Sequence, residues 1–280
     1  MMDLCIKLRT FVNIQISILI CLILNPSPVQ NIEYYKTYYT KEVLLLWNRS
    51  DMKPCCLNVH KSTNTLFFCF NRPQNFDSQV AFFNMDTKET ETVMGIKKGC
   101  ASAIDQDNDV VYLGGLKGIY KYDMETKKPE FYAEKDVHIK SLFYKERLYY
   151  IRHPDKKVFI EYDGQFAHIS EFMDLKLDHF LVSKGGIVYF TVKNNIYIYD
   201  KNETQWDLKG LRKTHAVNAI GEGNNGVVYL CTDRGVYTVV KNGLQKFMNE
   251  KNIVGITTDK NDNLILADNV SIFRLLRNEE

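Results

Sequence analysis

The chain lacks the features that mark several large classes of protein. Its formal net charge is +2, with both signs interspersed, so the charge gives no reason to expect a nucleic-acid partner. No apolar stripe with the 3.6-residue period of a helix runs beyond two turns. The motifs of α/β-hydrolases, of zinc proteases and of P-loop nucleotide-binding proteins are missing. These absences argue against a helical protein, a nucleic-acid-binding protein and three common classes of enzyme.

Cysteine is scarce as well, with 7 residues in 280. Two of them, Cys5 and Cys21, belong to the N-terminal segment described below. The others are Cys55, Cys56, Cys69, Cys100 and Cys231. This odd number allows at most two disulfides within the chain, and the pairing stays open. No C-x-x-C occurs, and we do not expect the adjacent thiolates of Cys55 and Cys56 to point at one zinc ion, so no metal site is predicted.

The first 30 residues are unlike the rest. A short basic head precedes an uncharged apolar run over residues 11–24. This run is shorter than the roughly 20 residues that a membrane-spanning helix needs, so we predict a signal peptide over residues 1–28 and secretion of the mature protein. An uncleaved signal anchor is the alternative, and the cleavage position stays open because prolines crowd the expected site. Secretion would expose three possible glycosylation sites, at Asn48, Asn202 and Asn269.

What the chain does have is aromatic side chains, with 17 Tyr and 16 Phe against only 6 Pro. Aromatic residues suit pleated, half-buried strands, and in this chain they recur at an equivalent position of a repeated sequence pattern. The aligned positions are Phe67, Tyr112, Tyr149, Tyr189, Tyr229 and Ile265, at separations of 45, 37, 40, 40 and 36 residues. A period near 40 residues with several short strands in each unit is typical of the blades of a β-propeller.

The ends of the repeat array indicate how the ring closes. The last unit, residues 253–277, leaves too little chain for a fourth strand, whereas an unassigned strand at Val43–Trp47 precedes the first unit. We expect this strand to complete the last blade, which removes an open sheet edge. The predicted fold is an all-β, six-bladed β-propeller of four-stranded blades over residues 43–280, after a lead-in over residues 29–42. An open pair of β-sheets is the alternative.

The mouth of the propeller channel is the expected ligand site. Basic residues occur in five of the six loops between second and third strands, at Arg72, Lys117, Arg152, Lys193 and Arg234. They are either solvated turn charges or a cationic rim that attracts a carboxylate. Polar and ring side chains gather just before the first strands, or near them, at His138, Lys140, Tyr150, Asp178, His179, His215 and Asn218. Rings and charges of this kind hold flat aromatic ligands, so these residues with Lys117, Arg152 and Arg234 are the predicted ligand-binding set.

Several sequence segments of the chain resemble the insect ommochrome-binding proteins. They are Ala101–Asp107, Val111–Asp123, Ile139–Tyr144, Leu148–Tyr150 and Leu177–Val182. The resemblance covers about residues 43–280 and is strongest across 100–200. It implies a secreted haemolymph protein that carries a small acidic aromatic pigment, a phenoxazinone derived from tryptophan, with no cofactor, no catalytic residues, and no nucleic-acid or membrane partner after signal removal. No family motif transfers specific ligand contacts to this chain.

An enzyme is the main rival interpretation. Six-bladed propellers similar to the gluconolactonases and paraoxonases hold a calcium ion in the channel and hydrolyse lactones or esters. Calcium takes six to eight oxygen ligands. At the corresponding positions this chain offers Asp178 and Asn218 but also Lys53, Lys140 and His138, so a carrier is favoured over a hydrolase. A propeller that docks another protein is the third interpretation, and it would require an exposed apolar patch.

Overall fold

The computed structural model describes residues 38–46, 54–72, 77–200, 216–240 and 243–278. Within these ranges the chain forms 23 strands and one 3₁₀ helix, η1 (Ser170–Phe172). No helix in the described ranges is long and apolar enough to span a membrane. Several sequence predictions fall outside these ranges: the signal peptide, the possible glycosylation sites at Asn48 and Asn202, Lys53 and His215.

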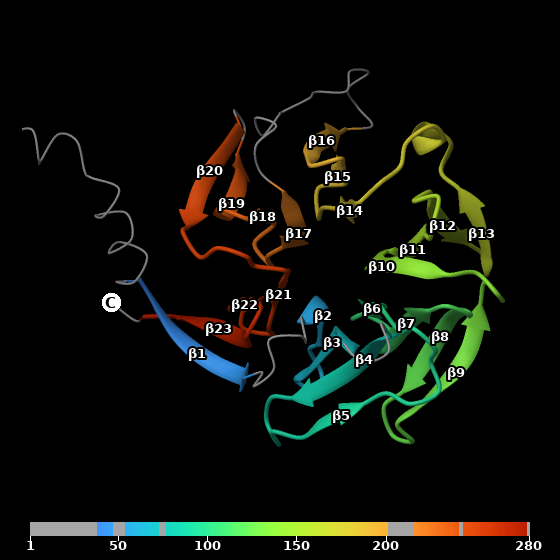
Figure 1. Ribbon diagram of the computed structural model, residues 1–280, viewed down its shortest axis with the longest axis horizontal. Helices are drawn as coiled ribbons and strands as arrows, with labels where there is room; N and C mark the ends of the chain where they lie inside the picture. Colours follow the sequence, from blue (N-terminus) through green and yellow to red (C-terminus); the bar gives the residue numbers. More distant parts are fainter. Residues whose placement is uncertain (1–37, 47–53, 73–76, 201–215, 241–242, 279–280) are drawn as a thin grey trace, which may run out of the picture. The chain divides into compact units, whose positions relative to one another are not determined.

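The predicted six-bladed β-propeller is confirmed, and residues 41–276 form one compact unit. Six antiparallel sheets follow one another around a central axis (Figure 1). The first blade comprises β2 (Pro54–His60), β3 (Thr65–Arg72), β4 (Asp77–Asn84) and β5 (Thr90–Thr92). The second comprises β6 (Ala101–Asp105), β7 (Val110–Gly115), β8 (Gly118–Asp123) and β9 (Lys128–Ala133). The third comprises β10 (Ile139–Lys145), β11 (Arg147–Arg152), β12 (Val158–Tyr162) and β13 (Gln165–His168).

The remaining blades follow the same order from the axis outward. The fourth has three strands in the described part of the chain, β14 (His179–Val182), β15 (Val188–Val192) and β16 (Asn195–Tyr199). After β16 the structure describes Asp200 and then resumes at Ala216. The fifth comprises β17 (Val217–Glu222), β18 (Val228–Thr232), β19 (Gly235–Val240) and β20 (Gly243–Met248). The sixth comprises β21 (Gly255–Thr258), β22 (Leu264–Ala267), β23 (Ser271–Arg277) and β1 (Tyr39–Leu46).

The N-terminal strand closes the ring, as the sequence predicted. β1 lies beside β23 at the outer edge of the sixth blade (Figure 1), and it begins at Tyr39 rather than at the predicted Val43. The Arg274 guanidinium on β23 donates to the Glu42 carboxylate of β1 at 2.7 Å and to Asp259 at 3.1 Å. Because β1 pairs with β23, that strand presents no open edge to another chain.

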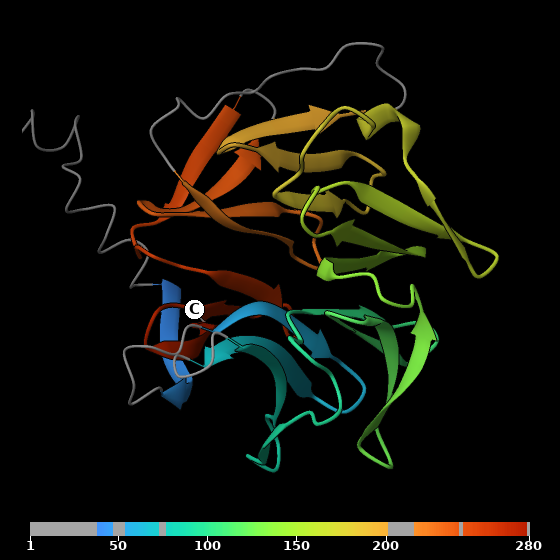
Figure 2. The same cartoon turned by 45° about the vertical axis from the view of Figure 1, so that its right-hand side comes forward.

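The aromatic residue that recurs in each second strand packs between neighbouring blades. Phe67 on β3 lies edge-on to Tyr122 of the second blade, with ring centroids 5.5 Å apart. Tyr112 on β7 stacks with Tyr144 of the third blade at 6.1 Å. The first and second blades lie side by side in both ribbon views (Figure 1, Figure 2). In these two blades the recurring ring fills the space against the next blade, whereas the sixth blade has the buried Ile265 at the equivalent position.

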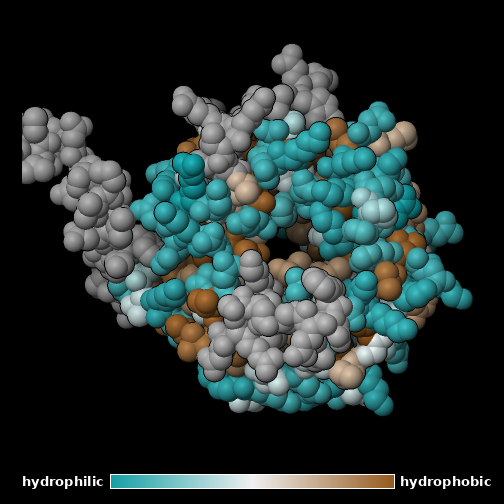
Figure 3. All heavy atoms as spheres, in the orientation of Figure 1, coloured by the Kyte–Doolittle hydropathy of each residue, from teal (hydrophilic) through white to brown (hydrophobic). Residues whose placement is uncertain are grey.

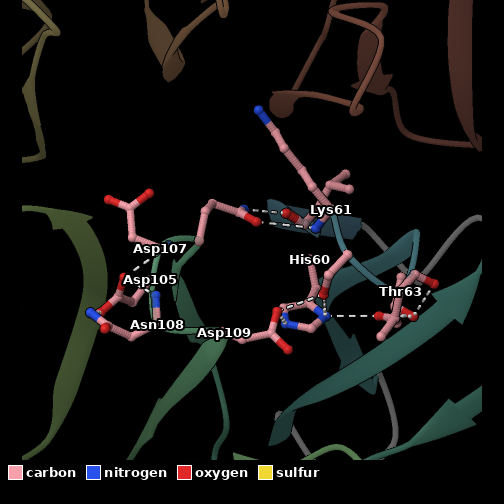
Figure 4. Close-up of polar contacts among 11 residues, drawn as sticks. His60, Lys61, Thr63, Asp105, Asp107, Asn108 and Asp109 are labelled. Carbon is pink, nitrogen blue, oxygen red and sulfur yellow. Dashed lines mark hydrogen bonds and ion pairs between the residues drawn. The ribbon is translucent and has the colours of Figure 1, made fainter.

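A buried histidine joins the first two blades on the face where the first strands end (Figure 4). His60, the last residue of β2, is 0% exposed. Its Nδ1 lies 2.7 Å from the Thr63 hydroxyl, and Nε2 lies 3.0 Å from the Asp109 carboxylate after β6. The side-chain amide of Gln106 donates to a backbone carbonyl of β2 at 2.6 Å. These contacts give His60 a structural role, as a hydrogen-bonded core residue.

Candidate functional site

The first strands of all six blades surround a cavity on the propeller axis. These strands are β2, β6, β10, β14, β17 and β21. The cavity measures about 360 Å³, within the range of roughly 300–1,000 Å³ that is usual for small-molecule sites. The space-filling view shows an opening near the centre of the ring (Figure 3). The fold thus creates a ligand-sized space to which every blade contributes side chains.

The carboxylate of Asp178 lies at the end of the cavity where the first strands begin, near the ammonium groups of Lys156 and Lys140. Lys156 donates to Asp178 Oδ1 at 2.5 Å, and the backbone N–H of Lys193 donates to Oδ2 at 3.0 Å. Lys140 on β10 donates to the Asp178 backbone carbonyl at 3.1 Å, and its Nζ lies 3.6 Å from the carboxylate. Burial raises the pKa of Asp178, but the hydrogen bonds from Lys156 and Lys193 outweigh it and hold the pKa below its usual range. Two ammonium groups therefore face one carboxylate, which leaves a net positive charge.

The hydrogen bonds of His179 set its tautomer. Its Nε2 lies 3.1 Å from the backbone carbonyl of Asn218 on β17, and a carbonyl oxygen only accepts, so Nε2 must carry the proton. Its Nδ1 then accepts from the Thr191 hydroxyl at 2.8 Å. Burial lowers the pKa of His179, and the nearby charge of Lys140 lowers it further. His179 is therefore a neutral imidazole at pH 7 that joins the fourth and fifth blades.

The middle of the cavity is lined by apolar and small polar side chains. Leu142, Phe180 and Ile220 are among the apolar ones. The amide nitrogen of Asn58 on β2 donates to the Ser102 carbonyl at 2.9 Å and to the Ser102 hydroxyl at 3.0 Å. An apolar wall with a few oriented polar groups suits the body of a flat organic ligand.

A second cavity of about 290 Å³ adjoins the first toward the opposite face. Its lining includes three lysines and one glutamate, at Lys61, Lys145, Lys184 and Glu222. The Nζ of Lys145 lies 3.6 Å from Glu222, and Lys61 donates to Asn224 at 2.5 Å. The sequence pattern did not single out these residues. They could have been predicted from their position at or just after the end of a first strand. This position places them at the other mouth of the same channel.

Four of the predicted site residues line the central cavity: Lys140, Asp178, His179 and Asn218. Each lies at or beside the start of its blade's first strand. The ring arrangement brings them together because equivalent positions in successive blades face the same axis.

Two predicted residues of the third blade do not line this cavity. Tyr150 is 1% exposed, its hydroxyl donates to Glu134, and its ring stacks on Phe159 with centroids 4.8 Å apart. Arg152 donates to Asp155 at 2.5 Å and lies over the same Phe159 ring at 4.6 Å. Both side chains pack on a face of the third blade, and Tyr150 also contacts the second blade.

Three further predicted residues, among those that the structure describes, lie on the outside of the mouth. Lys117 is 53% exposed and pairs with Asp136 at 2.7 Å. The His138 ring packs against His153 with centroids 4.5 Å apart, and Arg234 is exposed in the turn before β19. The cationic rim stays a prediction, with Lys117 and Arg152 already engaged by carboxylates.

The charged groups of the central cavity are poorly suited to a metal ion. Among the residues that the structure describes, no group of three His, Cys, Asp or Glu side chains is placed to hold one. The carboxylate of Asp178 is occupied by Lys156 and approached by Lys140. Ammonium groups at these places compete with a cation for the same oxygens.

The protein is thus a six-bladed β-propeller with a ligand-sized cavity on its axis. Solved structures with the same architecture include a putative gluconolactonase, with a TM-score of 0.66, 11% identity, and coverage of 86% of this chain and 92% of that one. A gluconolactonase from Xanthomonas campestris has a TM-score of 0.63 and 10% identity over 86% and 90% of the two chains. The WD40 propeller domain of Doa1 has a TM-score of 0.61 and 12% identity over 86% and 97%. At these identities the similarity shows the fold alone.

The sequence comparison is more specific. The chain is 29% identical to an ommochrome-binding protein of Manduca sexta over 231 residues, which are 79% of this chain and 82% of the relative. This similarity supports membership of the ommochrome-binding protein family and confirms the resemblance found in the sequence. No protein-family model matches the chain. A relative that binds a ligand is consistent with a ligand-binding propeller.

Proposed function

We propose that the protein is a secreted carrier that holds an ommochrome-type pigment or its precursor, an acidic phenoxazinone derived from tryptophan, in the central cavity. The observation that carries this proposal is the composition of the cavity, which combines a net positive group at one end with an apolar middle. A pigment carboxylate would lie near Lys140, and the ring system would lie along the apolar wall. The ommochrome-binding relative supports the same ligand class.

The chemistry of the site favours binding over catalysis. A general base needs a nitrogen or oxygen that is free to take a proton from the substrate. Both ring nitrogens of His179 are engaged, by Thr191 and by the Asn218 carbonyl. The Asp178 carboxylate is hydrogen-bonded on both oxygens. These two groups are therefore suited to fixing the shape and charge of the cavity.

The proposal is tested by the visible absorption spectrum of the secreted, purified protein, with metal analysis on the same sample. A bound chromophore, or a spectral shift on titration with xanthommatin, with no stoichiometric calcium, would support the carrier. A colourless protein that leaves the xanthommatin spectrum unchanged and contains about one calcium ion per chain would contradict it. That result would instead favour the calcium-dependent hydrolase that was the rival interpretation of the sequence.

A further inference from the structure

Three cysteines of the first blade meet at the end of the central cavity where the first strands begin. Cys55 and Cys56 lie on β2 and line the cavity. Cys69 lies on β3, directly opposite Cys55 in the antiparallel register, and is 0% exposed. Both tandem cysteines pack against the buried cluster that contains Cys69. We call Cys55, Cys56 and Cys69 the thiol cluster.

A distortion of β2 makes this convergence possible. Neighbouring residues of a regular strand point to opposite faces of the sheet, so the two adjacent thiols would be expected to diverge. The β2–β3 register shifts between Cys55 and Asn58, and Cys56 has a φ of 53°. This left-handed conformation is unfavourable for a residue with a side chain. Despite their adjacency on the strand, both Cys55 and Cys56 pack against the buried cluster that contains Cys69.

The five described cysteines differ in their surroundings. While Cys55 and Cys69 are thiols, their hydrogen bonds lower the pKa of the Cys56 thiol, and the nearby charge of Lys140 lowers it further in either redox state. Burial raises the pKa of Cys100 to about 12 and also raises the pKa of Cys231. Only Cys56, among these five, combines an accessible position on the cavity wall with surroundings that favour the thiolate.

We propose that the thiol cluster is a thiol–disulfide site in which Cys55 and Cys69 form a disulfide while Cys56 remains a thiol at the cavity wall. Residues opposite each other in an antiparallel pair have Cα atoms about 4.5–5.5 Å apart, within the roughly 4.4–6.8 Å that a disulfide spans. Each of the two thiols gives up one proton and one electron. A low-molecular-weight disulfide accepts them by thiol–disulfide exchange and leaves as two thiols.

The inference rests on the secretion proposed above, because exported proteins pass through oxidising compartments. It does not depend on a bound pigment. A protein with this disulfide that binds no pigment would therefore contradict the proposed function alone.

Differential alkylation of the full secreted protein tests the pairing. The protein is unfolded in denaturant at mildly acidic pH while excess N-ethylmaleimide blocks its free thiols, then it is reduced, and the released thiols are labelled with iodoacetamide. We expect acetamide labels on Cys55 and Cys69 and maleimide on the other three, with fragment ions that separate Cys55 from Cys56. A bond from Cys69 to Cys56, a bond to Cys100 or Cys231, or maleimide on all five would overturn the proposal.

The melting temperature measured with and without dithiothreitol distinguishes a disulfide between Cys55 and Cys69 from two thiols that only pack together. Closing a loop of about 15 residues stabilises the folded state by about 3 kcal/mol. Reduction should therefore lower the melting temperature of the wild type by about 5–10 °C. Cys69→Ser should unfold at the same temperature with and without the reductant. Cys231→Ser, which alters a buried cysteine of the fifth blade, should keep the reductant-dependent shift. A wild type that does not respond to dithiothreitol would overturn the proposal.

The reactivity of Cys56 provides an independent check. In the folded, oxidised protein the disulfide has no S–H left to donate to Cys56, so the reactivity of this thiol depends on its place on the cavity wall near Lys140. Iodoacetamide should therefore modify Cys56 roughly 10-fold faster than Cys100 or Cys231, which do not line the cavity. Lys140→Gln should slow that reaction, because it removes the positive charge beside the thiolate. Equal rates at the three cysteines would contradict the placement of a free Cys56 thiol at the cavity wall.

Discussion

At the scale of single residues, Lys140 is the charge that the cavity offers to an acidic ligand. It is 30% exposed, lines the cavity and lies 3.6 Å from Asp178, whereas Lys156 is bonded to the same carboxylate at 2.5 Å. Burial lowers the pKa of Lys140, and Asp178 offsets part of that effect. The more weakly paired lysine is the one that a ligand carboxylate can engage.

Replacing this lysine should weaken pigment binding. We expect Lys140→Gln to reduce xanthommatin affinity on the order of 10-fold, about 1.4 kcal/mol, with a larger loss at low salt because screening weakens charge attraction. Lys128→Gln, an exposed lysine on the outer strand β9, removes the same charge far from the axis and serves as the control. Spectroscopic titration measures both. Equal affinity of Lys140→Gln and wild type would show that the pigment does not use this charge.

His179 makes stability depend on pH. Because its folded-state pKa is lowered, the unfolded chain binds more protons once the pH falls below the usual value of about 6.5. Stability contributed by this group is therefore complete above pH ~6.5 and declines in acid, by up to about 1.4 kcal/mol per pH unit. His179→Gln should flatten the decline in unfolding free energy between roughly pH 6.5 and 5, measured by urea denaturation. An equally steep decline in His179→Gln would contradict the assignment.

At the scale of the elements, two glycines set the same turn in different blades. Gly118 begins β8 and Gly235 begins β19, with φ of +126° and +141°. A Cβ on Gly118 would lie 2.6 Å from the Ala133 carbonyl oxygen, and one on Gly235 would lie 2.4 Å from that of Met248. At these positions the fourth strand of the blade lies so close to the third that only glycine fits.

Gly118→Ala should therefore lower the unfolding free energy by about 3 kcal/mol, because it combines an unfavourable φ with a backbone clash. Gly164→Ala is the matched control, since Gly164 has a φ of +78° and a Cβ added there would meet no atom within 4 Å. It should cost about 1 kcal/mol. Chemical denaturation compares the two. Similar losses would mean that the close approach of β9 relaxes at little cost.

At the scale of the whole molecule, the ring is held by packing between blades and by β1. A ligand on the axis touches strands of all six blades, so its binding energy adds to the stability of the entire ring. No single blade could provide this site, because each contributes only the edge of one strand.

Bound pigment should therefore raise the melting temperature of the whole propeller. At a free xanthommatin concentration of about 100 times Kd, the folded state gains about 2.7 kcal/mol, which corresponds to a rise of about 5–10 °C for a domain of this size. Differential scanning calorimetry measures the shift. If the pigment spectrum shows binding but the melting temperature is unchanged, the pigment binds the unfolded chain as tightly as the folded one and does not need the native cavity.

The sequence predicted the architecture well because blades are built locally. The alternation within each strand and the ring at Phe67, Tyr112 and the equivalent positions are properties of short segments, and their repetition defines the propeller. The closing strand was also predicted from the sequence, by the missing fourth strand after residue 277. Its start was misplaced by several residues because the polar Tyr39–Glu42 segment shows no apolar pattern.

The candidate site was only partly accessible from the sequence. Lys140, Asp178, His179 and Asn218 were found because the start of a first strand is recognisable in each repeat. Several of their contacts were not, since Lys156 with Asp178, Lys140 with Asp178, and His179 with Asn218 join residues of different blades.

By itself, then, the sequence determined the repeat, the six blades and the positions that face the axis, because these depend on patterns within about 40 residues. Only the tertiary structure decided which charges are already paired and which thiols meet. Lys117 pairs with Asp136, Asp178 is approached by Lys140 from the neighbouring blade, and Cys55 lies opposite Cys69. Such outcomes depend on a local change of φ or on the closure of the ring, and neither leaves a periodic mark in the sequence.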